Sequence, residues 1–280
     1  MARTGFLRSA TAIGAVAVVT LALVAVAAKW PGRKSVVGIG GFRNPGLEMS
    51  YEIAVTAHCA DCLSYAVKTR DKVVTFSCRN CAVHEASFVV DATAIASLSE
   101  AFLDSRFFSM PRLNEGYPQQ FDHVSSQTWS YRDERQTHEV KTLRAPLNAD
   151  LQRLRDRMLS IGRVDYFTKT PPFELIQELL KGGHWNPSSE GLAYLAGTHE
   201  YQAVQFLLDY KGGYLGGRRI TDEVLEQAAR GADVQMMQLI VSYLPEPQRA
   251  AAASRMLEIL TRYPRPEYAA AVKWLTDAPK

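Results

Sequence analysis

An internal repeat in the C-terminal part of the chain constrains the fold most. The apolar segments 192–196 and 225–229 are 33 residues apart, and the segments that follow them, 203–208 and 236–241, have the same offset. The apolar residues recur at helical spacing, and a short turn separates the two segments of each pair. A third unit with a two-residue insertion spans 257–275, and a half unit precedes the array at 175–180. This period predicts stacked helix pairs that bury their apolar faces against neighbouring pairs.

The helix pairs resemble ankyrin repeats over about residues 173–278, because the period and the paired short helices match that family. The family's Thr-Pro-Leu-His opening is replaced by Ser189–Leu192 and Asp222–Leu225, and the Gly-His of its turn survives only as His199. The resemblance implies an all-α ankyrin-like solenoid over residues 170–280 that binds another protein. A generic α-solenoid would have the same architecture. Ankyrin-like arrays bind partners through their inter-repeat loops, which makes Trp185 and Tyr214 the expected contact residues.

All four cysteines of the chain lie within 23 residues, at the spacing C-x2-C-x15-C-x2-C. A hairpin turn near residue 71 would bring the two pairs together at its open end. Such a cluster suits either a tetrahedral zinc site of four thiolates or two cross-strand disulfides. If the thiols are oxidised, we expect the pairs Cys62–Cys78 and Cys59–Cys81. An oxidising compartment would favour disulfides, and the cytosol would favour thiolates and metal.

Residues 48–162 predict an α+β domain. Alternating apolar residues predict strands at 51–55 and 87–90 and two hairpins, 65–76 and 128–142. Asp91 is the expected cap of a helix whose buried face carries Ile95, Leu98 and Phe102, and a second helix follows Pro146 with Leu147, Leu151, Leu154 and Met158 on one face. Residues 109–126 read as a long loop.

This domain resembles a family of bacterial domains of unknown function over about residues 48–160. The matching segments are Cys59–Tyr65, Arg106–Phe108 and Arg144–Leu147. Leu63 stands where the family has proline, and Cys78 and Cys81 are additions to its pattern. The resemblance implies an extracytoplasmic, envelope-associated domain that is sometimes joined to ankyrin-like repeats. It therefore favours disulfides over zinc, and it implies no activity.

The N-terminus predicts a membrane segment. Residues 10–28 form an uncharged apolar stretch of 19 residues, close to the length of about 20 that spans a bilayer as a helix. We favour an anchor over a cleaved signal within residues 1–28, although Ala25–Ala27 offers a cleavage site. Residues 29–47, rich in Gly, Pro and Arg, read as a linker. Positive charges flank the apolar stretch on both sides, so charge leaves the orientation open.

The sequence lacks a complete catalytic constellation. Asp122, His123 and the pair Ser125-Ser126 have no partner that a motif positions beside them. The net charge is only +3, and no basic tract suggests nucleic acid as a partner. The sequence thus predicts a non-enzymatic, single-pass membrane protein that binds another protein, with its soluble part periplasmic or extracytoplasmic and no cofactor. The alternatives are a cytosol-facing adaptor with a four-cysteine zinc knuckle and a thiol- or metal-dependent sensor.

Overall fold

The computed structural model describes residues 46–56, 63–115, 124–143, 145–182, 185, 187–210 and 220–277. All described residues belong to one compact unit of the chain. Among them, none of the helices combines the length and the apolarity that a bilayer crossing requires. The predicted anchor at 10–28 lies outside the described residues, as does the predicted linker apart from Gly46 and Leu47. Leu47 is buried, so the folded domain begins inside the expected linker.

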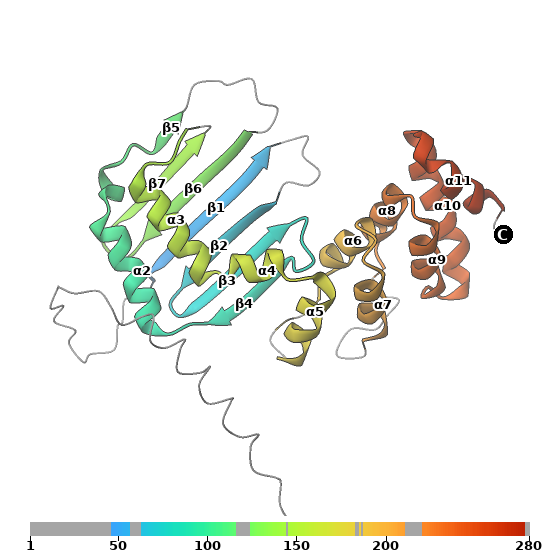
Figure 1. The fold of residues 1–280 in the computed structure, drawn as a ribbon, viewed down its shortest axis with the longest axis horizontal. Helices are drawn as coiled ribbons and strands as arrows, with labels where there is room; N and C mark the ends of the chain where they lie inside the picture. Colours follow the sequence, from blue (N-terminus) through green and yellow to red (C-terminus); the bar gives the residue numbers. More distant parts are fainter. Residues whose placement is uncertain are drawn as a thin grey trace, which may run out of the picture. The chain divides into compact units, whose positions relative to one another are not determined.

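The N-terminal half of the described chain forms a seven-stranded mixed sheet (Figure 1). The strands are β1 (Glu48–Thr56), β2 (Ser64–Arg70), β3 (Val73–Arg79), β4 (Glu85–Val89), β5 (Leu113–Glu115), β6 (Val124–Arg132) and β7 (Thr137–Leu143). Their order is β4-β3-β2-β1-β6-β7-β5, antiparallel except for the parallel pair β5 and β7. Both predicted hairpins are present. The expected loop at 109–126 is wrong in part, because it contains β5 and the start of β6.

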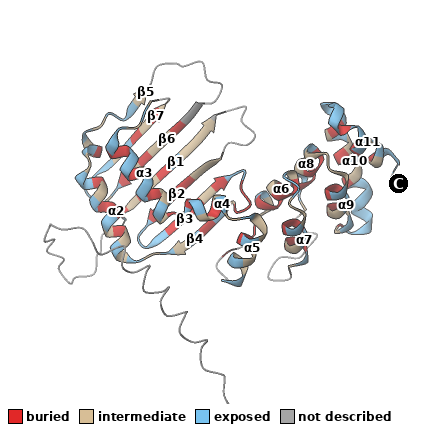
Figure 2. Cartoon of the chain, in the orientation of Figure 1, coloured by how far each residue is buried: buried red, intermediate tan, exposed pale blue. Residues whose placement is uncertain are grey.

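One face of the sheet is covered by helices (Figures 1 and 2). The predicted helix faces are buried, except that Leu147 lies before the start of its helix and is only partly buried. The covering elements are α2 (Ala92–Asp104), the 3-10 helix η2 (Arg106–Ser109), α3 (Ala149–Ile161) and α4 (Val164–Lys169). Alternate strand residues point into this layer, so large aromatic side chains such as Tyr51, Phe76 and Trp129 are fully buried. Asp91 precedes α2 as expected, but its side chain makes no capping hydrogen bond.

The C-terminal half consists of helices in its described parts. They are α5 (Pro172–Lys181), α6 (Ser189–Gly197), α7 (Tyr201–Asp209), α8 (Asp222–Gly231), α9 (Val234–Ser242), α10 (Glu246–Arg262), the 3-10 helix η4 (Pro266–Tyr268) and α11 (Ala269–Asp277). Helices α6 and α8 begin 33 residues apart, as do α7 and α9. The turns repeat as well, because His199 (φ 63°) and Ala232 (φ 55°), also 33 residues apart, are both left-handed. Helix α6 packs on α8, and α8 packs on α10.

Candidate functional site

The two described cysteines pair with each other. Cys78 in β3 and Cys81 in the following turn form a disulfide with a Cα–Cα distance of 5.8 Å. The expected pairs Cys62–Cys78 and Cys59–Cys81 are therefore wrong. The two-residue turn at Asp71 and Lys72 sets a register that places Tyr65 opposite Cys78. The chain also turns back after Arg79, which brings Cys81 to Cys78.

The predicted zinc cluster needs all four thiolates, so it is incompatible with this disulfide. Cys59 and Cys62 lie outside the described residues. Within the described ranges, no group of three or more His, Cys, Asp or Glu side chains could hold a metal ion.

We call the sheet and its covering helices α2 to α4 the sheet domain. Helix α6 contacts this domain at the β3–β4 turn, residues 80–84. The disulfide, a left-handed Asn80 (φ 59°) and a hydrogen bond from the Cys78 N–H to the His84 carbonyl (2.8 Å) hold the turn together. Helix α6 approaches it so closely that a Cβ atom on Gly191 would lie 2.6 Å from the carbonyl oxygen of Ala82. Only glycine therefore fits at this contact without a backbone shift.

Trp185 strengthens this contact instead of facing a partner. Its indole N–H donates to the carbonyl of Glu85 at 3.0 Å, and the residue is only 9% exposed. The expectation of an exposed binding residue is therefore wrong, because Trp185 lies against β4 and its ring is buried. Tyr214, the other expected contact residue, lies outside the described residues.

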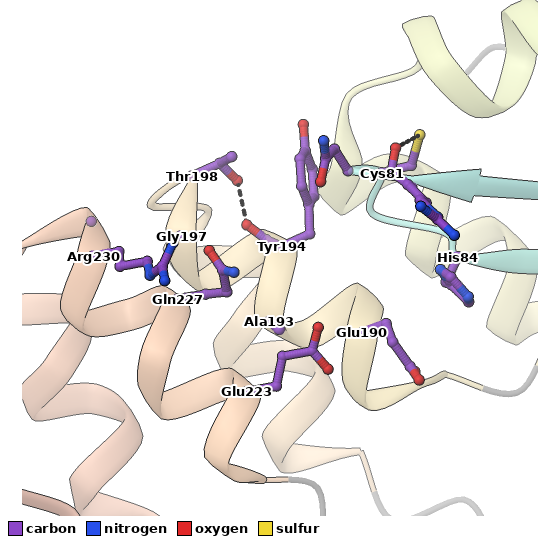
Figure 3. A pocket seen from close by; sticks show the side chains of 13 residues that line it. Cys81, His84, Glu190, Ala193, Tyr194, Gly197, Thr198, Glu223, Gln227 and Arg230 are labelled. Atoms are coloured by element: carbon purple, nitrogen blue, oxygen red, sulfur yellow. Dashed lines mark hydrogen bonds between the residues drawn. The ribbon is translucent and has the colours of Figure 1, made fainter. Parts of the chain in front are cut away.

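A hollow of about 480 Å³ lies between the β3–β4 turn and the helices α6 and α8 (Figure 3). Residues at equivalent positions of α6 and α8 line it, because the two helices are 33 residues apart and turn the same face towards the hollow. The equivalent pairs are Glu190 and Glu223, Tyr194 and Gln227, and Gly197 and Arg230. The end of β3 contributes Arg79, and the turn contributes Asn80, Cys81 and His84. We call this space the turn-side hollow.

Charges of both signs line the turn-side hollow. The pKa of the Glu190 carboxyl is lowered by a hydrogen bond from its own backbone N–H, by a hydrogen bond from the Ser188 hydroxyl and by the electrostatic effect of His84. Arg230 makes an ion pair with Glu226 at 2.6 Å, with 57% of its side chain exposed. The hollow therefore offers a carboxylate and a guanidinium to a ligand at neutral pH.

A second hollow of about 530 Å³ continues this surface between α8, α10 and η4. It shares Gln227 and Arg230 with the turn-side hollow. Ile259 and Arg262 of α10, which also line it, follow these two residues by 32 positions, one fewer than the repeat period. Its remaining lining residues are Glu226, Arg255, Tyr263, Arg265 and Tyr268. We call this space the arginine hollow and the two together the first-helix groove. The repeat period indicates which helix positions are equivalent, but it does not show that they line a groove.

Other shifted titratable groups connect neighbouring repeats. The Tyr201 hydroxyl donates to Asp233, the residue that caps α9, and the His199 ring lies 3.1 Å from the carbonyl oxygen of Gly231. Burial and the Asp233 carboxylate raise the pKa of Tyr201 to about 12. Burial opposes ionisation of Asp233, but hydrogen bonds from Tyr201 and from the Met236 N–H lower its pKa overall. Packing between neighbouring repeats therefore explains the shifted pKa values of Tyr201 and Asp233.

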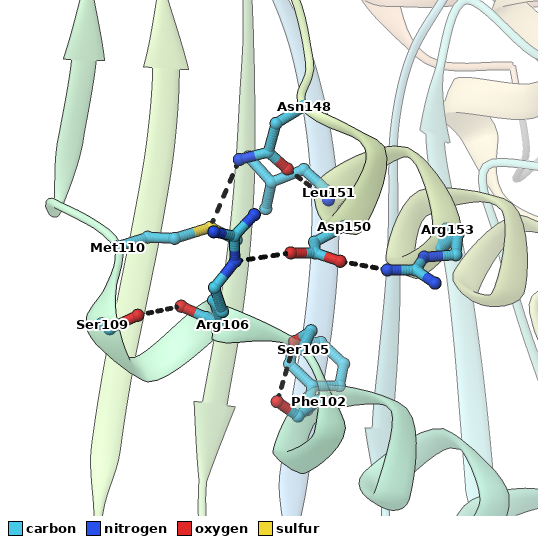
Figure 4. A network of polar contacts seen from close by, with 9 residues as sticks. All are labelled: Phe102, Ser105, Arg106, Ser109, Met110, Asn148, Asp150, Leu151 and Arg153. Atoms are coloured by element: carbon cyan, nitrogen blue, oxygen red, sulfur yellow. Dashed lines mark hydrogen bonds and ion pairs between the residues drawn. The ribbon is translucent and has the colours of Figure 1, made fainter.

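A further polar network lies within the sheet domain (Figure 4). Asp150 accepts from Arg153 and from the Arg106 Nε at 3.4 Å, and Asn148 caps α3 through the Leu151 N–H at 2.9 Å. Hydrogen bonding by Arg153 is the main cause of the lowered pKa of Asp150, and Arg106 adds to it. The network joins η2 to the start of α3, which gives it a structural role that the sequence did not reveal.

Of the remaining sequence candidates, Ser126 is the one whose side chain the structure describes. Asp122 and His123 lie outside the described residues. Ser126 is buried in β6, where it pairs with Ala54 of β1 and Leu143 of β7. Comparison with known proteins adds no relative, because no family model, no curated protein and no solved structure matches the chain.

Proposed function

We propose that the chain is a non-enzymatic, membrane-tethered protein that binds another protein through the first-helix groove. One observation supports the proposal most directly. Corresponding residues of α6, α8 and α10, such as Tyr194, Gln227 and Ile259, line one continuous groove. Repeat arrays bind partners on such extended surfaces, which are formed by one row of helices. The resemblance to ankyrin repeats supports the same use of the array, with the apolar residues 10–28 as the anchor.

The groove has the composition of a protein interface. Tyrosine and arginine are enriched in the residues that dominate binding energy, and both occur here at Tyr194, Tyr263, Arg230 and Arg262. Its two hollows adjoin along α8, so an extended segment of a partner could occupy both. Polar side chains around the rim would give specificity through hydrogen bonds.

A photoreactive residue in place of Gln227 tests the proposal in full-length chain expressed in its own membrane. The matched control is the same replacement at Gln235, which is exposed on the second helix of the same repeat, α9. We expect one defined protein to crosslink from position 227 and not from position 235. Equal crosslinking from both positions, or none from position 227, would refute binding through the groove.

The disulfide favours a second candidate function, a thiol-dependent sensor. Cys81 lines the turn-side hollow, and its bond to Cys78 holds the turn on which α6 rests. Reduction would therefore loosen one wall of the groove. If the sensor proposal holds, reduction of the purified chain should change the crosslinking yield from position 227 by several-fold, whereas an unchanged yield would eliminate it.

A further inference from the structure

The arginine hollow concentrates cationic side chains on one part of the groove. Arg230, Arg255, Arg262 and Arg265 line it, and Glu226 is the one acidic side chain among its lining residues. Tyr263 is 68% exposed at its edge, and the guanidinium of Arg265 lies 5.7 Å from the centre of the Tyr268 ring. The hollow thus combines exposed positive charge with aromatic surface.

The glutamates around the hollow do not saturate these arginines. Glu258 forms ion pairs with both Arg255 (2.7 Å) and Arg262 (2.6 Å), and Arg265 pairs with Glu267 at 3.8 Å. A guanidinium has five N–H donors, so one shared carboxylate leaves donors for a ligand. Exposed pairs of this kind contribute little to stability, and a ligand can therefore replace them at low cost.

We infer that the partner binds the arginine hollow through a segment rich in Asp and Glu. This inference rests on the proposed function and names the chemistry of its partner. Carboxylates match the planar fork of arginine and form paired charge-assisted hydrogen bonds with it. Arg255 and Arg262 are the central contacts, since they share one glutamate, and the exposed ring of Tyr263 packs against the neighbouring part of the segment.

The charge pattern along the groove favours a peptide over an anionic membrane. Glu190 and Glu223 line the turn-side hollow, at the other end of the groove. A uniformly anionic surface would meet these carboxylates as well as the arginines, and like charges repel. A peptide can place acidic residues over the arginines and neutral or basic residues over the glutamates.

Charge also argues against two segments of this chain as occupants. Residues 1–45 carry six Lys and Arg and no acidic residue, and residues 211–219 carry three basic residues and no acidic one. Neither segment complements a hollow lined by four arginines. The occupant that fits is therefore an acidic segment of another protein.

The test compares two double substitutions in the full-length chain with the photoreactive residue at position 227. Arg255→Gln with Arg262→Gln alters the hollow, and Arg132→Gln with Arg135→Gln makes the same charge change at exposed positions of the sheet domain. We expect the first pair to reduce the crosslinking yield about tenfold and the second to leave it unchanged. The crosslinked peptide of the partner should be rich in Asp and Glu. A neutral or basic peptide, or equal yields from both double variants, would overturn the inference.

A lower crosslinking yield could also result from loss of folding, so a second variant is chosen that should bind the partner more tightly. Glu258→Gln removes the carboxylate that Arg255 and Arg262 share, so we expect the purified chain to bind a fluorescent Glu/Asp-rich peptide a few-fold more tightly than wild type. Weaker binding by this variant would contradict the inference. Phosphatidylglycerol vesicles and inorganic phosphate are the comparison ligands, and binding of either in preference to the peptide would also overturn it.

The two proposals fail in different ways. Absence of any crosslink from position 227 in wild type defeats the proposed function. A crosslink that is present but insensitive to Arg255→Gln with Arg262→Gln defeats only the acidic partner.

Discussion

The sheet domain and the helical array are built from contacts of different range. In the sheet, the central strand β1 pairs with β2 and β6, so Glu48 lies between Arg70 and Arg132, which are distant in the chain. In the array, α6 packs on α8 and α8 packs on α10, so each of these helices contacts the next helix but one along the chain. In a linear array each repeat contacts only its neighbours, and the terminal repeats need caps. The β3–β4 turn and Trp185 supply that cap for the first helices, so the array depends on the sheet domain.

The largest effect should come from removing the Trp185 ring. Because Trp185 is buried and donates to Glu85, Trp185→Ala should lower the free energy of unfolding by about 3 kcal/mol. Trp185→Phe keeps an aromatic ring and loses the hydrogen bond, at a cost of about 1 kcal/mol. Urea unfolding, followed by far-UV circular dichroism, measures both. A change below about 1 kcal/mol for the alanine variant would show that the array does not need the sheet domain.

Substitution of two glycines in α6 tests the contact between this helix and the β3–β4 turn. Gly191→Ala would place a methyl group 2.6 Å from the Ala82 carbonyl oxygen, and we expect a loss of about 2 kcal/mol. Gly197→Ala, in the same helix, would bring its methyl group no closer than 3.4 Å to Gln227. It should be neutral or stabilising by up to about 1 kcal/mol through helix propensity. Equal effects of the two substitutions in thermal unfolding would contradict the docking of α6 on the turn.

The disulfide should contribute about as much as the Gly191 contact. Closing so short a loop stabilises by about 2 kcal/mol through the entropy of the unfolded chain, which Cys78→Ser with Cys81→Ser would remove. Trypsin cleaves after Arg79, so the fragments 73–79 and 80–106 should stay linked until reductant is added. A non-reduced link from fragment 44–68, which holds Cys59 and Cys62, to either of them would restore the cross-strand pairing.

The smallest effect concerns Asp150 in the sheet domain. Its pKa is lowered by Arg153 and Arg106, so its ionised form is more stable in the folded chain than in the unfolded chain. This contribution is present above the unfolded pKa of about 3.9 and is lost as the pH falls through the lower folded pKa. Asp150→Asn should cost about 1 kcal/mol at pH 7 and weaken the dependence of stability on pH below about pH 4. Asp156→Asn is the control, because its pair with Arg155 is exposed. An equally steep acid transition in Asp150→Asn would contradict the role of the network.

Local patterns in the sequence predicted much of the fold. The alternation at 65–69 and 73–76 predicted the hairpin of β2 and β3, and the offset of 33 residues predicted the positions of α6 to α9. The faces with Ile95, Leu98 and Phe102, and with Leu151, Leu154 and Met158, are buried as expected. Such patterns succeed because strand and helix periods depend on neighbours within a few residues.

Sites that depend on contacts between distant elements were missed or mistaken. Composition alone could not show that Trp185 packs on β4, and the repeat pattern did not reveal that Arg230, Arg255 and Arg262 share a hollow. The network around Asp150 joins segments 44 residues apart. Each of these follows from how elements pack, which short-range periodicity does not encode.

By itself, the sequence determined the period of the helix pairs, the strands of the main hairpins and the faces that had to be buried. The tertiary structure alone decided the cysteine pairing, the burial of Trp185 and the position of the first-helix groove. A one-residue change in strand register changes which side chain stands opposite Cys78, and the two-residue turn at Asp71 and Lys72 fixes that register. The repeat period specified which helices stack, but the groove formed where α6 met the β3–β4 turn, through the long-range contact of Gly191 with Ala82.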